Sequence, residues 1–275
     1  MGTVAHMLRT VLLALVIGLG VTLLANVAPT VYLHRALSHR SLTLHPVSSQ
    51  VFRFLTWITT GIRPRQWVAV HRKHHAFTDV EGDPHSPVIH GWFKVQMLNV
   101  AMYRAEAQNP QTMAKYAKDL PPTWADRWFY DRAWLGLGLG VAFLVVVFGW
   151  QVGLLAAFVH VNLYLGGSAA VNAIAHHFGR KPYDNTAGNL QWLAFLTAGE
   201  GLHNNHHAAP TSAKLAHRWY EIDPGWYVIK VLTWLRLAKT RTMQRIRPEG
   251  RPENRVGQRE ALATLRRERT PAASS

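Results

Sequence analysis

The longest uncharged stretch of the chain reads AWLGLGLGVAFLVVVFGWQVGLLAAFVHVNLYLGGSAAVNAIA and covers residues 133–175. A transmembrane helix needs about 20 apolar residues, so this stretch is roughly twice the length of one span. The sequence FGWQVG near its middle predicts a tight turn between two helices, about 133–149 and 151–171. Trp150 then suits the membrane–water interface. The stretch therefore predicts a hairpin that crosses the membrane twice.

A second uncharged run, VLLALVIGLGVTLLANVAPTVYL (11–33), is long enough for one more span. A cleaved signal peptide is the alternative, but the run is too long and no small-x-small cleavage site is obvious. The segment VFRFLTWITTGI (51–62) is short and interrupted by Arg53, which predicts an interfacial helix at about 47–62. These segments predict an all-α integral membrane helical bundle of three to four spans.

The charge pattern orients this bundle. Lys and Arg are concentrated in 35–73 and 214–269, which the positive-inside rule places in the cytoplasm. The net charge of +15 would suggest nucleic acid in a soluble protein. No nucleic-acid motif is present, and anionic lipid head groups or an anionic substrate carrier explain the charge more simply. We expect a membrane domain over 1–235, a basic, disordered tail over 236–275, and a bacterial inner-membrane location.

Histidine is the unusual component of the sequence. The segments HRALSH (34–39), HRKHH (71–75) and HNNHH (203–207) hold eight of its sixteen histidines. The i, i+3, i+4 spacing of the second and third segments places imidazoles on one helical face. The i, i+5 spacing of the first diverges by about 140° on an ideal α-helix. That pair could reach different metals, or the helix could end between them.

A fourth element, NAIAHH (172–177), follows the last span and places Asn172 and His176 one turn apart. All four elements fall on the predicted cytoplasmic face, which indicates one shared site. Nine imidazoles exceed the needs of one metal ion, so two ions are implied. The chain has no cysteine, which excludes disulfides, iron–sulfur clusters and Cys-based zinc sites. Imidazole alone does not choose among iron, zinc, copper and nickel.

Carboxylates near these histidines could hold the distal ring N–H groups of metal ligands. Glu200 and Asp83 are the main candidates, and Asp79, Glu81 and Asp184 are also available. Six other histidines are interpreted as structural, because a lone histidine near a membrane is usually hydrogen-bonded or snorkelling: His6, His45, His90, His160, His177 and His217.

The three histidine segments resemble the HxxxxH, HxxHH and HxxHH boxes of integral-membrane fatty acid desaturases. GEGLHNNHH, DPHSP (83–87) and NAIAH are similar to the stearoyl-CoA delta-9 branch of that family, and the resemblance covers roughly residues 10–235. It implies a cytoplasmic helical cap around two iron ions that activate O₂. The metal ligands implied are His34, His39, His71, His74, His75, His176, His203, His206 and His207, with Asn172 acting through a water molecule.

The resemblance also implies a fatty acyl substrate, carried on coenzyme A, acyl carrier protein or a membrane lipid, in a narrow apolar tunnel. Arg72 and Lys73 could attract the phosphates of such a carrier, and a basic patch facing solvent or lipid is the alternative reading. Electrons are expected from a separate ferredoxin, rubredoxin-like protein or small cytochrome. Candidates to line the tunnel, or else to pack in the core or at the interface, are Trp57, Trp67, Trp92, Phe93, Trp192 and Phe195.

Two other functions remain open at this stage. A hydroxylase or an acetylenase would use the same histidine boxes, and the GEGLHNNHH and Asn172/His176 elements favour a desaturase over a hydroxylase. A membrane metal transporter would also collect histidines, but transporters place their ligands at the bilayer midplane within broken helices. The family that the chain resembles usually has two spans before its first box, whereas only one fits before His34.

Overall fold

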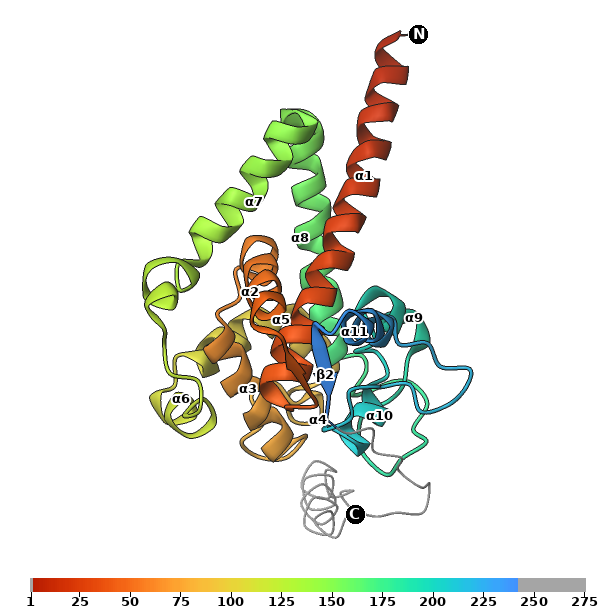
Figure 1. The fold of residues 1–275 in the computed structure, drawn as a ribbon. Coiled ribbons are helices and arrows are strands. Elements are labelled where there is room, and N and C mark those ends of the chain that lie inside the picture. The colour runs from red at the N-terminus through yellow and green to blue at the C-terminus, as the bar shows by residue number, and fades with distance from the viewer. Residues whose placement is uncertain (1, 242–275) are drawn as a thin grey trace, which may run out of the picture.

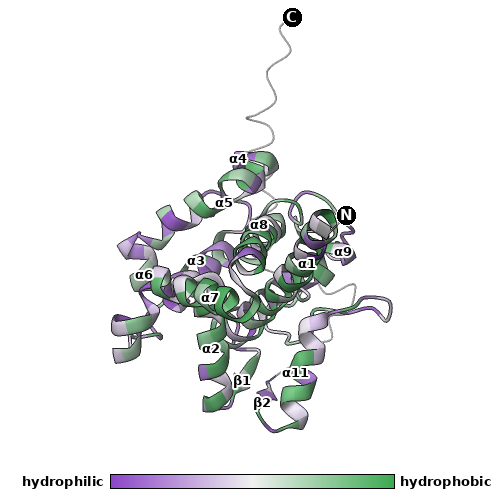
Figure 2. Ribbon diagram, turned by 90° about the horizontal axis from the view of Figure 1, so that it is seen from above, coloured by the Kyte–Doolittle hydropathy of each residue, from purple (hydrophilic) through white to green (hydrophobic). Residues whose placement is uncertain are grey.

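Three apolar helices dominate one end of the structure, a computed structural model that describes residues 2–241. Helices α1 (Gly2–Pro29), α7 (Ala133–Phe148) and α8 (Trp150–Asn172) extend away from the remaining helices (Figure 1). Viewed from above, these three are mostly hydrophobic, whereas hydrophilic residues appear in α3 and α6 (Figure 2). Within residues 2–241, two helices are long and apolar enough to cross a membrane, Thr3–Ser38 and Trp150–Asn172, and α7 is a shorter apolar helix.

The predicted hairpin is confirmed as a pair of packed helices. Gly149 joins α7 to α8 with φ +82°, a backbone angle that glycine adopts without steric strain. Helix α2 (Pro46–Thr60) confirms a helix where residues 47–62 predicted one, and it packs against both α1 and α7. The polar end consists of α3 (Pro64–Phe77), α4 (Pro87–His90), α5 (Trp92–Ala107), α6 (Pro110–Tyr116), η2 (Asp126–Tyr130), α9 (Gln191–Leu196), α10 (His203–Ala208) and α11 (Pro224–Trp234).

Helix α1 continues without a break into a π-helix, η1 (Thr30–Ser38), which carries the first histidine box. Pro29 lies at the junction; proline lacks a backbone N–H and disturbs α-helical bonding. Bonds in a π-helix join residues five apart, and His39 N donates to His34 O at 3.1 Å. The expectation that these histidines diverge is therefore wrong. Five residues close one hydrogen-bonded turn of a π-helix, which brings His34 and His39 to the same side, whereas five residues of an α-helix span nearly one and a half turns.

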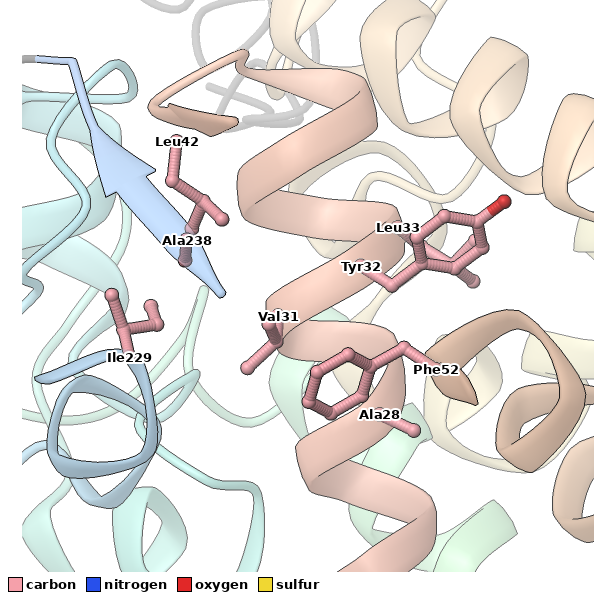
Figure 3. Packing of buried hydrophobic residues seen from close by; sticks show 8 residues of the cluster. All are labelled: Ala28, Val31, Tyr32, Leu33, Leu42, Phe52, Ile229 and Ala238. Carbon is pink, nitrogen blue, oxygen red and sulfur yellow. The ribbon is translucent and has the colours of Figure 1, made fainter. Parts of the chain in front are cut away.

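A small antiparallel sheet, absent from the all-α expectation, braces the outer side of η1. Strand β1 (Leu42–Leu44) pairs with β2 (Ala238–Thr240). Residues of α1, η1, α2, α11 and both strands form one buried cluster, Ala28, Val31, Tyr32, Leu33, Leu42, Phe52, Ile229 and Ala238 (Figure 3). Strand β2 extends the described structure past residue 235, where the sequence placed the domain boundary. That boundary stays a prediction, and residues 242–275 of the expected tail lie outside the described residues.

His160 of α8, interpreted as structural, joins this helix to α1 and α2. Its Nδ1 lies 3.1 Å from Thr22 Oγ1 of α1, and its Nε2 lies 2.8 Å from the carbonyl oxygen of Thr59 in α2. A polar side chain in an apolar bundle is costly unless it is paired, and both ring nitrogens of His160 are paired. The structural interpretation of this histidine is confirmed.

Glycines of α7 allow close approach of α2. A Cβ on Gly136 would lie 2.6 Å from the carbonyl oxygen of Trp57, and one on Gly140 would collide with the carbonyl oxygen of Ile58. Gly140→Val is therefore expected to destabilise the bundle by about 1–3 kcal/mol, because a backbone atom cannot yield as a side chain can. Thermal unfolding in detergent measures this effect. Gly138→Val is the matched control, since nothing lies within 4 Å of its Cβ; equal destabilisation by both variants would contradict the packing argument.

Candidate metal centre

The nine histidines predicted as ligands come together in two neighbouring groups. Within each group, one ring nitrogen per residue lies within 4.8 Å of all the others. The π-helix η1 and helix α3 supply most of the first group, while α10 and the turn after α8 supply most of the second. The first group is His34, His39, His71, His75 and His206, and the second is His74, His176, His203 and His207.

The Nε2 atoms of the first group face one another. His206 Nε2 lies 3.0 Å from His34 Nε2 and 2.9 Å from His75 Nε2. His39 and His71 approach through the same atoms at 2.8 Å. One ring nitrogen cannot donate a hydrogen bond to two others at once, because it carries at most one proton. The arrangement thus presents several nitrogen lone pairs to a common point.

The second group repeats this arrangement. His203 Nε2 lies 2.9 Å from His176 Nε2 and 3.2 Å from His207 Nε2. His74 Nε2 is buried and has no hydrogen-bond partner among the described residues. A buried polar atom without a partner needs an explanation, and a metal ion bound by this nitrogen supplies one.

The protonation state of the rings suits metal binding. Burial lowers the pKa far below the ordinary value of histidine, and neighbouring imidazoles lower it further, at His39, His71, His75, His203, His206 and His207. Neutral imidazole is the form that coordinates metals. The rings are therefore deprotonated and converge without a carboxylate among them, which fits a pair of divalent ions.

These pKa shifts predict that the metal-free protein loses stability in acid. The folded chain keeps the six rings neutral, while the unfolded chain binds protons as the pH falls below about 6.5. Each such proton lowers the free energy of unfolding by about 1.4 kcal/mol per pH unit. Among the described histidines with a shifted pKa, His74 alone acts oppositely: burial lowers its pKa, but Asp83 outweighs burial and raises it. The melting temperature of metal-free protein should fall from pH 7 to pH 5.5, and a constant value would contradict neutral rings.

Three carboxylates hold the far sides of these rings. Glu200 Oε1 lies 2.8 Å from His34 Nδ1, and Asp83 Oδ1 lies 3.0 Å from His74 Nδ1, as the sequence predicted. Asp79 Oδ2 lies 2.9 Å from His176 Nδ1. In this position a carboxylate fixes which ring nitrogen carries the proton and leaves Nε2 free for a metal.

The carboxylates remain ionised despite being enclosed. Burial would raise the pKa of Glu200, but His34, Arg35 and Thr30 together hold it below its usual range. Burial would likewise raise the pKa of Asp79 and Asp83, but the paired imidazoles outweigh burial and lower the pKa of both carboxyls. Of the other acidic residues considered, Glu81 and Asp184 are exposed.

Glu200 offers a direct test of this arrangement. Glu200→Gln keeps the size of the side chain but removes the charge that orients His34, and losses of about 10–100-fold in metal affinity are typical of such outer partners. Competition with a metal chelator measures the affinity. The exposed Glu81→Gln is the control and should bind metal as the wild type does. Equal affinity in both variants would contradict the role of Glu200.

Asn172 lies at the C-terminal end of α8, four residues before His176. Its Nδ2 donates to Asn99 Oδ1 of α5 at 2.9 Å, and this hydrogen bond fixes the orientation of the Asn172 amide. The amide oxygen of Asn172 remains the atom through which a water-mediated contact with a metal would run. That role stays a prediction.

The two asparagines inside HNNHH are structural residues that sequence reasoning missed. Asn204 and Asn205 are fully buried. Asn204 Nδ2 donates to the carbonyl oxygens of Tyr183 and Ala187, at 3.0 and 2.9 Å. Asn205 Nδ2 donates to Glu221 Oε2 at 2.7 Å. Helix α10 has six residues and is too short to be stable alone, so these hydrogen bonds hold it in place. The position of two amides between candidate ligands was the signal in the sequence for this role.

His85 is a further missed residue beside the centre. It is buried, its ring stacks on His74 with centroids 4.7 Å apart, and both of its nitrogens lack a hydrogen-bond partner among the described residues. Burial and, to a smaller extent, the neighbouring His74 together lower the pKa of His85 to about 3. DPHSP was recognised in the sequence, but the signal for its histidine was weak because no second histidine lies near it at helical spacing.

Arg72 and Lys73 are partly buried and paired with neighbouring segments. Arg72 donates to the carbonyl oxygens of Leu37 and Tyr116 and pairs with Asp119 at 2.6 Å. Lys73 pairs with Glu106 at 2.9 Å. Both cations thus brace α3 against its neighbours, and their role at a substrate head group stays a prediction.

The aromatic candidates for a tunnel separate into different environments. Trp67 stacks on His71 with centroids 4.7 Å apart and is partly buried. Trp57 is buried, and its Nε1 donates to the carbonyl oxygen of Arg132 at 3.2 Å. Trp92 is partly buried and packs edge-on against Phe178. The other three aromatic candidates are exposed on the surface: Phe93, Trp192 and Phe195.

Comparison with known proteins gives the family context of this centre. The family model described as fatty acid desaturase matches residues 9–232. The acyl-CoA C20 Delta5-desaturase of Anemone leveillei is 34% identical over 218 residues, or 76% of this chain and 67% of that protein. The sn-2 palmitoyl-lipid 9-desaturase of Nostoc sp. (strain 36) is 35% identical over 213 residues, or 75% and 73%. Delta-9 acyl-lipid desaturase 1 of Arabidopsis thaliana is 32% identical over 234 residues, or 82% and 74%.

Proposed function

The chain belongs to the fatty acid desaturase family of integral membrane oxidoreductases, and from that premise we propose that it introduces a double bond into a fatty acyl chain at a di-iron centre with O₂ as co-substrate. The observation that carries the proposal is the pair of adjacent groups of five and four imidazoles. Family membership supports acyl desaturation, and the nitrogen-only donor set supports the metal centre.

The chain's own residues have separate tasks in this reaction. The nine imidazoles would hold the irons through nitrogen, and Asn172 would do so through water. Two bound irons would supply the O₂ activation that removing hydrogen from an unactivated carbon requires. Glu200, Asp83 and Asp79 keep the distal ring nitrogens oriented. Five of the nine rings are buried and four are partly buried, and this enclosure would limit the access of bulk water to the reacting carbons and so limit side reactions.

The substrate is proposed to be an acyl chain on coenzyme A, acyl carrier protein or a membrane lipid. The names of similar proteins include both acyl-CoA and acyl-lipid desaturases, so the carrier class is open among these. Electrons would come from an external ferredoxin, rubredoxin-like protein or small cytochrome. An acidic carrier would complement the Lys- and Arg-rich face that we place in the cytoplasm of a bacterial cell.

Product analysis tests this proposal. The protein is expressed with a ferredoxin and its reductase, and cellular acyl chains are compared by mass spectrometry. A new unsaturated species is expected from the wild type and from His6→Ala, whose histidine is exposed on α1 far along the chain from every box. A hydroxylated or alkynyl product would show that the chain is a hydroxylase or an acetylenase and not a desaturase. No oxidised product from iron-loaded protein supplied with acyl-CoA, acyl carrier protein and acyl lipid would overturn the proposal.

A further inference from the structure

A cavity of about 330 Å³ opens beside η1 and shares no residue with the metal centre. Its volume lies at the lower end of the range typical of small-molecule sites. The wall comes from η1, β1 and α2, and its rim carries two arginines. The lining residues are Tyr32, Ala36, Leu37, Arg40, Leu42, Thr43, Leu44, Ser49 and Arg241.

The lining combines an apolar wall with uncompensated positive charge. Leu37, Leu42 and Leu44 supply the apolar part, and among residues 2–241 no carboxylate lines the cavity. Arg40 pairs through one nitrogen with Asp119, but that carboxylate is already shared with Arg72. Two guanidinium groups on one carboxylate leave a net positive charge, and a guanidinium has further N–H donors to offer.

The backbone presents Arg40 at the rim in an unusual conformation. Its φ of +51° lies in the left-handed region, which a residue with a side chain rarely adopts. The turn is held by Ser41, whose backbone N and Oγ donate to the carbonyl oxygen of Arg35 at 2.8 and 3.0 Å. Arg241 N in turn donates to Ser41 O at 2.9 Å. Such over-determined strain is typical of ligand-binding positions.

The cavity lies behind α2 and not on its exposed apolar face. Ser49 of α2 lines the cavity, whereas the exposed Val47, Val51 and Phe54 lie on the opposite side of the same helix, because two residues turn an α-helix by about 200°. Contact with the apolar part of a ligand therefore falls to the leucines of the lining.

We propose that this cavity binds the phosphate-bearing end of an anionic amphiphile. Arg40 and Arg241 would bind the phosphate, since arginine matches phosphate geometry with paired N–H donors. Leu37, Leu42 and Leu44 would contact the first apolar part of the molecule. The same chemistry could come from a bilayer phospholipid or from a soluble phosphate carrier such as coenzyme A. The proposal concerns binding and does not depend on the reaction proposed above.

Calorimetric titration of the full, metal-loaded protein in detergent tests this site with four probes: dihexanoylphosphatidylglycerol, dihexanoylglycerol, coenzyme A and inorganic phosphate. Both short-chain lipids are used below their micellar concentrations. The variants are Arg40→Gln/Arg241→Gln, Thr43→Trp, which fills the cavity from an exposed position, and the control Arg180→Gln, an exposed arginine outside the lining. Iron content is measured in each variant and is expected to be unchanged.

The expected result is that a phosphate-bearing amphiphile binds wild type and Arg180→Gln, and that affinity falls about tenfold or more in both cavity variants. Binding of the phosphatidylglycerol assigns the site to a bilayer lipid, and binding of coenzyme A without it assigns the site to a soluble carrier. The proposal is overturned if dihexanoylglycerol binds as tightly as its phosphorylated counterpart, if inorganic phosphate alone accounts for the affinity, or if the cavity variants bind as the control does.

Discussion

His206→Ala is expected to lower desaturation by more than 100-fold, the largest effect on activity in the chain. His206 Nε2 lies within 3.0 Å of ring nitrogens from both η1 and α3, so its loss removes the metal-binding nitrogen at the middle of the first group. Loss of an outer partner alone typically reduces metal affinity or activity by about 10–100-fold, and loss of a ligand should exceed that. Product formation per mole of purified protein measures the effect.

The matched control for this variant is His217→Ala. His217 lies outside both groups, and its ring bonds to the hydroxyl of Tyr183 at 3.0 Å. It should retain iron and activity, with a small loss of thermal stability. Substantial desaturation by folded His206→Ala protein would contradict the assignment of His206 as a ligand.

Asp223→Ala is expected to destabilise the protein by about 3–5 kcal/mol, the largest effect on stability, because it leaves the charge of Arg35 buried without a partner. The Arg35 guanidinium and the Asp223 carboxylate pair at 2.9 Å, and each side chain is 1% exposed. Arg35 also donates to the carbonyl oxygen of Ala213, so this pair ties the first histidine box to the segment that follows the third. Thermal unfolding of the detergent-purified protein measures the loss.

A double-mutant cycle separates charge from packing. Arg35→Met combined with Asp223→Leu removes both charges and keeps most of the volume, and it should be more stable than Asp223→Ala alone. If the double variant is as unstable as the sum of the single variants, the pair is not coupled and the argument from buried charge fails.

The sequence was sufficient to predict the nine converging histidines because their spacing has a direct geometric meaning. The i, i+3, i+4 boxes lie on single helical faces of α3 and α10, and Glu200 and Asp83 lie against ring nitrogens as expected. The hairpin followed equally directly from the length of one uncharged run. These predictions needed only local periodicity and the thickness of a membrane.

Features that depend on contacts between distant segments could not be predicted. The π-helix η1 follows from Pro29 and from packing against β1, β2, α2 and α11, which no local pattern reveals. The buried bonds of Asn204 and Asn205 reach residues up to 21 positions away. Arg72 looked like a surface cation, but its partner Asp119 lies 47 residues along the chain. The cavity at Arg40 likewise needs two strands that are almost 200 residues apart.

Iron stoichiometry in single-site variants tests the central claim that two groups of imidazoles hold two ions. Protein is purified without oxygen, loaded with Fe²⁺ and analysed for iron per chain, with X-ray absorption reporting the ligand atoms. The wild type should hold two irons surrounded by nitrogen and oxygen. His39→Ala in the first group and His207→Ala in the second should each lose most of one equivalent. A folded wild-type protein that desaturates with one iron or none, or variants that retain two, would contradict the account.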